Sequence, residues 1–255
     1  MLWKKGWWET RWLFLVCLGS IFLAYGLTFG GSDYDAASWS ERLQRSGNLS
    51  ASELQALNNY QGQTWALGFK GLLSFIWAYM AAVLGAACLM VDCPWPPSKC
   101  ASRSFTFSLP VSRRKILLSQ AAVGFGEMIL AALLPSLLLP IIARFHGQWF
   151  SWSDALIYML LTILGGAVFF WLAFLMTVIL GNWIVVSVMG QIVVLALYLS
   201  YLPFRRRPWW NILGVMGGES YFFHGRIPWL GLLTSLILSA VFMYAAVRIY
   251  ERRDL

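Results

Sequence analysis

The stretch Phe-Thr-Phe-Ser-Leu-Pro-Val-Ser-Arg-Arg-Lys, residues 105–115, lies between two long apolar segments. Pro110 fixes its own backbone angle and disfavours helix at Leu109, so we expect the chain to bend there. Ser112 can then cap the helix that follows. The three cations at 113–115 are typical of the cytosolic side of a membrane. The stretch therefore predicts a basic cytosolic elbow that leads into a membrane helix.

The composition is typical of a membrane protein. Of the 255 residues, 59% are hydrophobic and 12% are charged, whereas soluble domains carry about 25% charged residues. Apolar runs of about 20 residues recur, and each is long enough to cross a bilayer. We therefore predict an all-α, polytopic membrane protein. The net charge of +8 comes from cations at the ends of these runs, which favours contact with the lipid bilayer over binding of nucleic acid.

The apolar runs predict six transmembrane helices in a single transmembrane domain. Residues 1–11 mix Trp with Lys and Arg and are expected to form an interfacial elbow. Residues 30–64 are too polar for the membrane and are expected to form an outside helical loop. Residues 92–115 are expected to form a cytosolic coupling region, with a short coupling helix from about 98 to 107. The spans are expected at about 12–29, 65–91, 116–142, 154–180, 183–202 and 229–250.

Six spans place both termini on one side of the membrane. That side holds 11 of the Lys and Arg residues and the other side holds 8, so we expect both termini in the cytosol of a multi-pass protein of the cytoplasmic (inner) membrane. The triplet Arg205–Arg207 on the predicted outside counts against this orientation. We expect a tight turn at Gly181-Asn182 and a re-entrant or interfacial segment at 203–228.

Catalytic and metal-binding patterns are missing from the sequence. It contains no HExxH, no GxSxG and no phosphate-binding loop of the Walker type. The two histidines, His146 and His224, both fall in predicted outside loops, where a surface role is favoured over a metal pair. The Cys93-x6-Cys100 spacing matches no zinc site. We therefore predict no catalytic, metal or cofactor-binding residue in this chain and no enzymatic activity.

Glu127 is the one acid well inside a predicted span. It lies about 11 residues from the predicted start of the third span, which corresponds to ~16 Å at ~1.5 Å per residue. A charge at that depth is costly unless it faces protein or water. One hypothesis is a residue on a translocation path or a proton-linked site. The other is a structural hydrogen bond to Gln120, Gln191 or a neighbouring subunit.

Close helix contacts are the other feature that the sequence suggests. The spacings Gly26-x-x-x-Gly30 and Gly214-x-x-x-Gly218 can permit two helices to approach each other. Because the chain contains 22 glycines, such spacings also arise by chance.

The motif Ser-Leu-Pro-Val-Ser-Arg-Arg-Lys-Ile-Leu-Leu at 108–118 resembles the signature of ABC-2 type transporter permeases. The predicted six spans, the basic N-terminal elbow and the tail Tyr-Glu-Arg-Arg-Asp-Leu at 250–255 are also similar to that family. The chain departs from the family pattern at 96–102, where members often carry a Glu and a Gly-Thr pair. The contact with the family's separate ATPase subunit is therefore expected either to be built differently or to depend more on Arg103 and the cations at 113–115.

The resemblance implies a separate ATPase subunit, in two copies, that binds ATP and Mg. It also implies a second permease chain, identical or related, that pairs with this one around a central path. The residues expected to contact the ATPase subunit are Lys99, Arg103, Phe105, Phe107, Leu109, Pro110, Ser112, Arg113 and Arg114.

The function that we predict is the permease subunit of an ATP-driven ABC-2 type transporter, in the direction of export. One alternative is an ABC-type mechanotransmitter or membrane scaffold that moves no substrate. A further alternative is a polytopic membrane enzyme. An enzyme should concentrate His, Asp, Glu or Cys near a membrane boundary, and this chain does not.

Overall fold

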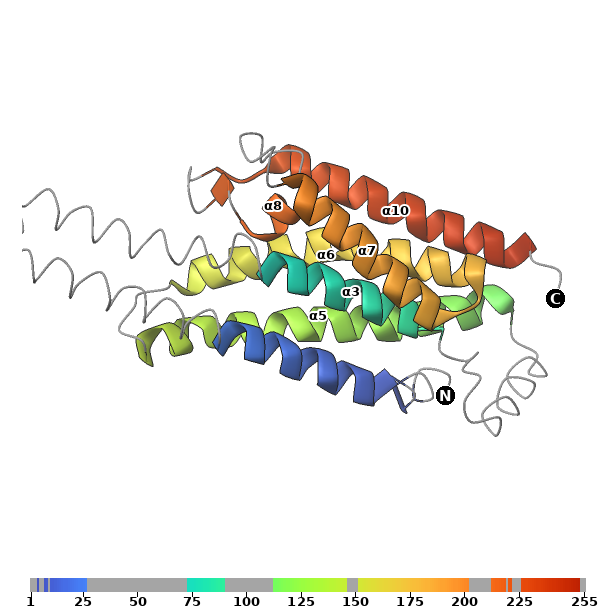
Figure 1. Ribbon diagram of the computed structural model, residues 1–255, viewed down its shortest axis with the longest axis horizontal. Coiled ribbons are helices and arrows are strands. Elements are labelled where there is room, and N and C mark those ends of the chain that lie inside the picture. The colour runs from blue at the N-terminus through green and yellow to red at the C-terminus, as the bar shows by residue number, and fades with distance from the viewer. Residues whose placement is uncertain are drawn as a thin grey trace, which may run out of the picture.

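The computed structural model is a bundle of helices (Figure 1). Every regular element in the described part of the chain is a helix, and no strand occurs there, which confirms the predicted all-α class. The described residues are 4, 7, 8, 10–26, 73–89, 112–145, 151–201, 212–218, 220, 221 and 226–252.

Each of the six predicted spans contains a described helix. Three helices, α5, α6 and α10, are long and apolar enough to cross a membrane. The N-terminal helix, α3 and α7 are apolar but shorter within the described residues, so six crossings remain a prediction. The helix bounds are Thr10–Gly26 for the N-terminal helix, Ser74–Ala87 for α3, Arg113–Phe145 for α5, Trp152–Leu180 for α6, Trp183–Tyr201 for α7, Ile212–Met216 for α8 and Trp229–Arg252 for α10.

Local sequence signals explain where α6 ends and α7 begins. Gly181 adopts a left-handed conformation with φ of 69° and closes α6, which a residue with a side chain rarely tolerates. Asn182 follows, and its Oδ1 accepts from the backbone N–H of Ile184 at 3.0 Å, so it caps α7. The predicted tight turn at these two residues is confirmed.

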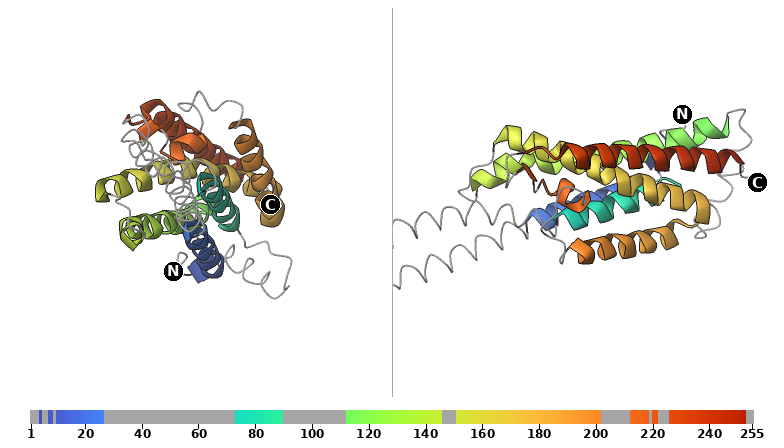
Figure 2. Two further views of the ribbon diagram at one scale, coloured as in Figure 1. Left: turned by 60° about the vertical axis from the view of Figure 1, so that its left-hand side comes forward. Right: turned by 90° about the horizontal axis from the view of Figure 1, so that it is seen from above.

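Helix α6 is the centre of the bundle. It packs against α3, α5, α7, α8 and α10, and the views in Figures 1 and 2 show these helices running side by side. A Cβ on Gly85 of α3 would lie 2.2 Å from the backbone oxygen of Phe170 in α6. A Cβ on Gly165 of α6 would lie 2.2 Å from Cγ of Met216 in α8. Missing side chains therefore permit these close contacts.

The predicted glycine contacts differ from the observed ones. A Cβ on Gly26 would meet nothing within 4 Å, so the described residues make no close contact there, and Gly30 lies outside them. Gly214 is buried within α8. Gly85 and Gly165, which belong to neither predicted pair, lie where helices approach closely, because the choice depends on which faces meet.

The short helix α8 lies within the segment expected to be re-entrant or interfacial. It has five residues, which is about 7.5 Å of helix and too short to cross a bilayer. Leu213, Val215 and Met216 are buried, and α8 packs on α6, α3 and α10. Its relation to a membrane surface remains a prediction.

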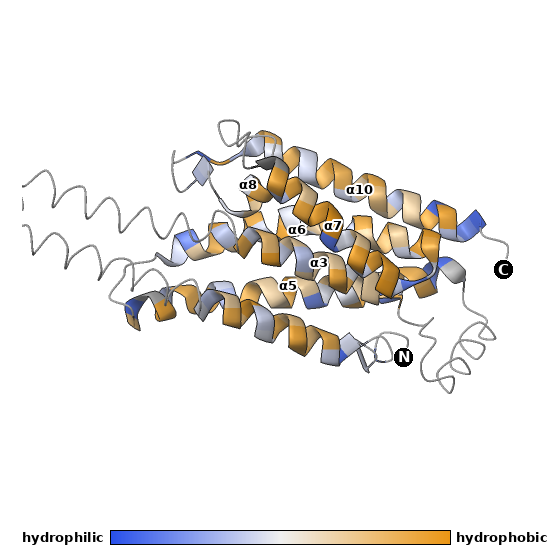
Figure 3. Cartoon of the chain, viewed as in Figure 1, coloured by the Kyte–Doolittle hydropathy of each residue, from blue (hydrophilic) through white to orange (hydrophobic). Residues whose placement is uncertain are grey.

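The outer surface of the bundle is apolar. Figure 3 shows hydrophobic residues along most of each long helix, with hydrophilic residues mainly near helix ends. Ile192 of α7 and Leu230 of α10 are 62% and 63% exposed. Soluble monomers rarely expose large continuous apolar patches, so this surface suits hydrocarbon. The start of the N-terminal helix, the start of α5 and the end of α10 lie toward the same end of the bundle (Figure 1).

Candidate functional site

The predicted elbow is described only from Ser112 onward. Helix α5 begins at Arg113, and the carbonyl of Ser112 accepts from the backbone N–H groups of Lys115 at 2.9 Å and Ile116 at 3.2 Å. Ser112 therefore occupies the N-cap position of α5, where the sequence predicted a capping residue, and the bonds seen there are made by its backbone carbonyl. The remaining predicted contact residues before the helix lie outside the described residues: Lys99, Arg103, Phe105, Phe107, Leu109 and Pro110.

The described part of the elbow lies beside the end of α10. Arg114 is exposed and lines a groove of about 310 Å³ together with Arg248 and Glu251 of α10. Leu118 and Val247 form apolar parts of the same groove. The basic start of α5 and the charged end of α10 thus form one surface at this end of the bundle.

Glu127 is held by the N-terminal helix. Its side chain is 2% exposed, and the hydroxyl of Thr10 donates a hydrogen bond to its Oε1. Oε2 has no hydrogen-bond partner among the described residues. Gln191 is not the partner, because no side chain in the described residues bonds Oε2 and Gln191 of α7 donates instead to the hydroxyl of Tyr79 in α3. Thr10 was not singled out from the sequence, since it lies 117 positions from Glu127.

The position of Thr10 also changes the expected depth of Glu127. Thr10 is next to Arg11, whose guanidinium carbon lies 3.8 Å from the ring centre of Trp8 and 5.5 Å from that of Trp12. Trp and Arg are typical of the membrane interface. We therefore expect a carboxyl bonded to Thr10 to lie nearer the membrane surface than the ~16 Å that follows from the ~1.5 Å rise per residue.

A groove opens beside Glu127. Its volume is about 440 Å³, and it lies between Trp7 and one face of α5. Apart from Glu127 and Ser119, the lining is apolar. The residues of α5 that line it are Ser119, Ala122, Val123, Gly126, Glu127 and Leu130. The groove therefore combines a buried carboxyl, an indole ring and hydrocarbon walls.

A second cluster of buried polar side chains has one member from each of four helices. The side chains of Trp77 in α3, Ser136 in α5 and Tyr158 in α6 lie around the hydroxyl of Tyr25 in the N-terminal helix. All four are at most 2% exposed. Polar groups that meet inside an apolar bundle fix how helices are arranged. This cluster therefore has a structural role, and the sequence alone did not indicate it.

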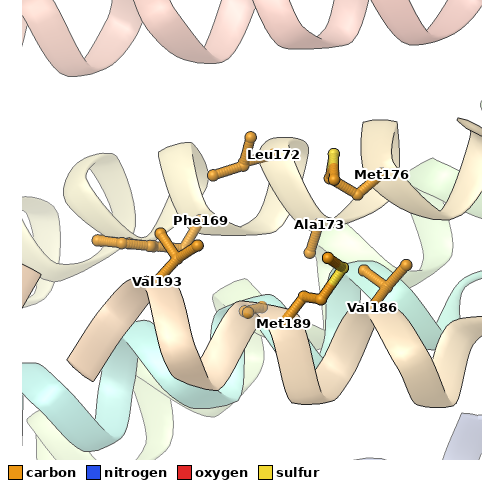
Figure 4. A pocket seen from close by; sticks show the side chains of 9 residues that line it. Phe169, Leu172, Ala173, Met176, Val186, Met189 and Val193 are labelled. Carbon is orange, nitrogen blue, oxygen red and sulfur yellow. The ribbon is translucent and has the colours of Figure 1, made fainter. Parts of the chain in front are cut away.

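An entirely apolar cavity lies between α6 and α7. Its volume is about 90 Å³, and Figure 4 shows Phe169 and Ala173 of α6 pointing toward the side chains of α7. It has no polar group that could perform chemistry. The lining residues labelled in Figure 4 are Phe169, Leu172, Ala173, Met176, Val186, Met189 and Val193.

The described residues contain no group of three or more His, Cys, Asp or Glu that could hold a metal ion. His146, His224, Cys93 and Cys100 lie outside those residues. Among the described residues, the groove beside Glu127 combines a buried carboxyl with an apolar lining. Comparisons with protein-family models, with curated proteins and with solved structures found no match to this chain.

Proposed function

We propose that this chain is the permease subunit of an ATP-driven ABC-2 type transporter that exports a substrate across the cytoplasmic membrane. The observation that carries the proposal is the start of α5. The motif at 108–118 resembles the family signature, and α5 begins within it at Arg113, directly after Ser112. Two copies of a separate ATPase subunit would supply the energy from ATP and Mg, and a second permease chain would complete the path.

The packing of α5 supports a mechanical role. The helix has 33 residues, which is about 50 Å at ~1.5 Å per residue. It packs against α3, α6 and α10. Because a helix is stiff and packed interfaces shift as units, a push at Arg113 and Arg114 would move the bundle as a rigid body. The chain's own residues offer no phosphate loop, so the push must come from a partner.

The proposed orientation in the membrane follows from the elements that lie at the elbow end of the bundle. The start of the N-terminal helix, the start of α5 and the end of α10 lie toward one end (Figure 1). With the elbow facing the ATPase subunits, both termini would be cytosolic. This orientation agrees with the excess of Lys and Arg predicted for that side.

The test is a double charge reversal, Arg113→Glu with Arg114→Glu. The chain is co-expressed with the ABC ATPase encoded beside it, and copurification, ATP hydrolysis and transport in vesicles are measured. We expect at least a tenfold loss of copurified ATPase with an unchanged melting temperature. Arg144→Glu, at the opposite end of α5, is the matched control and should change neither the amount of copurified ATPase nor the melting temperature. Equal copurification in the double variant and the control would refute the docking role.

The assay also separates the alternatives. Stimulated ATP hydrolysis without movement of any substrate would replace export by mechanotransmission. Absence of any ABC ATPase after purification from native membranes would remove the ABC-2 proposal itself.

A further inference from the structure

The groove beside Glu127 has the shape of a small binding site. Its α5 lining residues fall at spacings of three and four positions, so they share one helix face. A Cβ on Gly126 would meet nothing within 4 Å, and Ala122 is exposed. Small side chains at these two positions therefore leave the space of about 440 Å³ open.

The carboxyl of Glu127 sets the charge that this groove prefers. Oε1 accepts from Thr10, but Oε2 has no hydrogen-bond partner in the described part of the chain. The side chain lines the groove and is 2% exposed. A buried carboxylate oxygen without a partner is unfavourable. A cation in the groove would offset that cost, whereas an anion would increase it.

The opposite wall also suits a cation. Trp7 lines the groove and is 38% exposed, so its ring is accessible. A cation over an indole face is attracted by the ring's quadrupole, and quaternary ammonium groups are recognised in this way. Beyond Glu127, Leu130, Leu134 and Leu138 form an exposed stripe along α5. Their spacing of four positions offers a continuous track for a hydrocarbon chain.

We propose that the groove binds a cationic amphiphile, with its ammonium group between Glu127 and Trp7 and its hydrocarbon chain along the leucine stripe of α5. The ligand class is an alkylammonium compound. The proposal goes beyond transport by an ABC-2 permease and does not depend on it, because equilibrium binding requires neither an ATPase subunit nor ATP.

The test measures binding of radiolabelled dodecyltrimethylammonium to the full chain in phosphatidylcholine nanodiscs. Dodecanol is the neutral probe of matched chain length, and empty nanodiscs define partition into lipid. Glu127→Gln keeps an oxygen that can accept from Thr10 but loses the charge, and we expect it to bind the cation at least tenfold more weakly. Trp7→Leu should weaken binding about three- to tenfold. Dodecanol binding should be the same in all variants.

Two controls make the result specific. Glu251→Gln removes an acid from α10 outside this groove and should bind the cation as the wild type does. Ala122→Trp fills the groove and should abolish saturable binding. Melting temperature and size-exclusion profile check that each variant is folded, and Trp7→Leu tests the opposite wall if Glu127→Gln is unstable.

The proposal is overturned if dodecanol binds as tightly as the cation, because Glu127 then contributes no charge to recognition. Equal cation binding by the wild type and Glu127→Gln would also overturn the proposal. If Ala122→Trp instead separates a dimer and leaves cation binding unchanged, the groove is an interface between two copies and the proposal is wrong.

Discussion

Replacing Gly85 with alanine should destabilise the protein, because α3 and α6 are in backbone contact there. The new Cβ would lie 2.2 Å from the oxygen, 2.9 Å from the carbonyl carbon and 3.0 Å from Cα of Phe170. These are backbone atoms, so no side-chain rotation can relieve the overlap. Helices α3 and α6 would have to separate by roughly 1 Å, and such overpacking costs about 1–3 kcal/mol.

A Gly→Ala change inside a helix also adds a favourable contribution from helix propensity, and a control variant measures that contribution alone. Alanine is favoured over glycine in a helix interior by about 1 kcal/mol. A Cβ on Gly19 of the N-terminal helix would meet nothing within 4 Å, so Gly19→Ala should leave stability unchanged or raise it. At Gly85 the overlap outweighs this gain, and we expect a net loss of about 1–2 kcal/mol.

The assay is thermal unfolding of both variants in detergent micelles, at one scan rate because unfolding of such proteins is commonly irreversible. A loss of 1 kcal/mol lowers the melting temperature by about 2–4 °C in a chain of this size, so we expect Gly85→Ala to melt about 2–8 °C below the wild type. If Gly85→Ala melts at or above Gly19→Ala, the two backbones do not approach each other as the structure shows.

Two other contacts yield predictions. Thr10→Val removes the hydroxyl that donates to Glu127, and we expect it to lower stability by about 1–3 kcal/mol in the same melting assay. Thr10→Ser keeps a hydroxyl and should recover the stability. Equal melting temperatures of Thr10→Val and Thr10→Ser would exclude the bond. The hydroxyl of Tyr221 donates to Asp154 at 2.9 Å, and this bond raises the pKa of Tyr221 above its ordinary value of 10.0. Because the folded-state pKa is the higher one, the stabilisation is present at lower pH and is lost as the pH rises through it. The melting difference between wild type and Tyr221→Phe should therefore be positive at pH 8 and vanish at strongly alkaline pH; a difference that does not change with pH would contradict this.

Local signals in the sequence predicted the helical elements well. Ser112 marked the start of α5, and Gly181 with Asn182 marked the turn between α6 and α7. These signals act through hydrogen bonds within a few residues, so they can be recognised without knowing the fold. The apolar runs predicted the helices between them because their length and composition suffice.

Contacts between helices were predicted poorly, and Glu127 is the clearest case. Its rarity inside an apolar run marked it for attention, but the sequence suggested Gln120, Gln191 or a neighbouring subunit as the partner, and within this chain Thr10 donates to it. Likewise, the Gly26 spacing left a close contact and chance both open; the described residues make no close contact at Gly26, while Gly85 lies against α6.

The contacts between helices were hard to predict because the helices are apolar on all sides. In a soluble protein, a polar outer face tells which side of a helix is buried. Here Leu230 faces outward and Leu213 lies inside, yet both are apolar, so the sequence determined the helices and their ends but not their facing sides. The folded arrangement alone brought Thr10 to Glu127, placed the side chains of three other helices around Tyr25 and opened the groove beside Trp7.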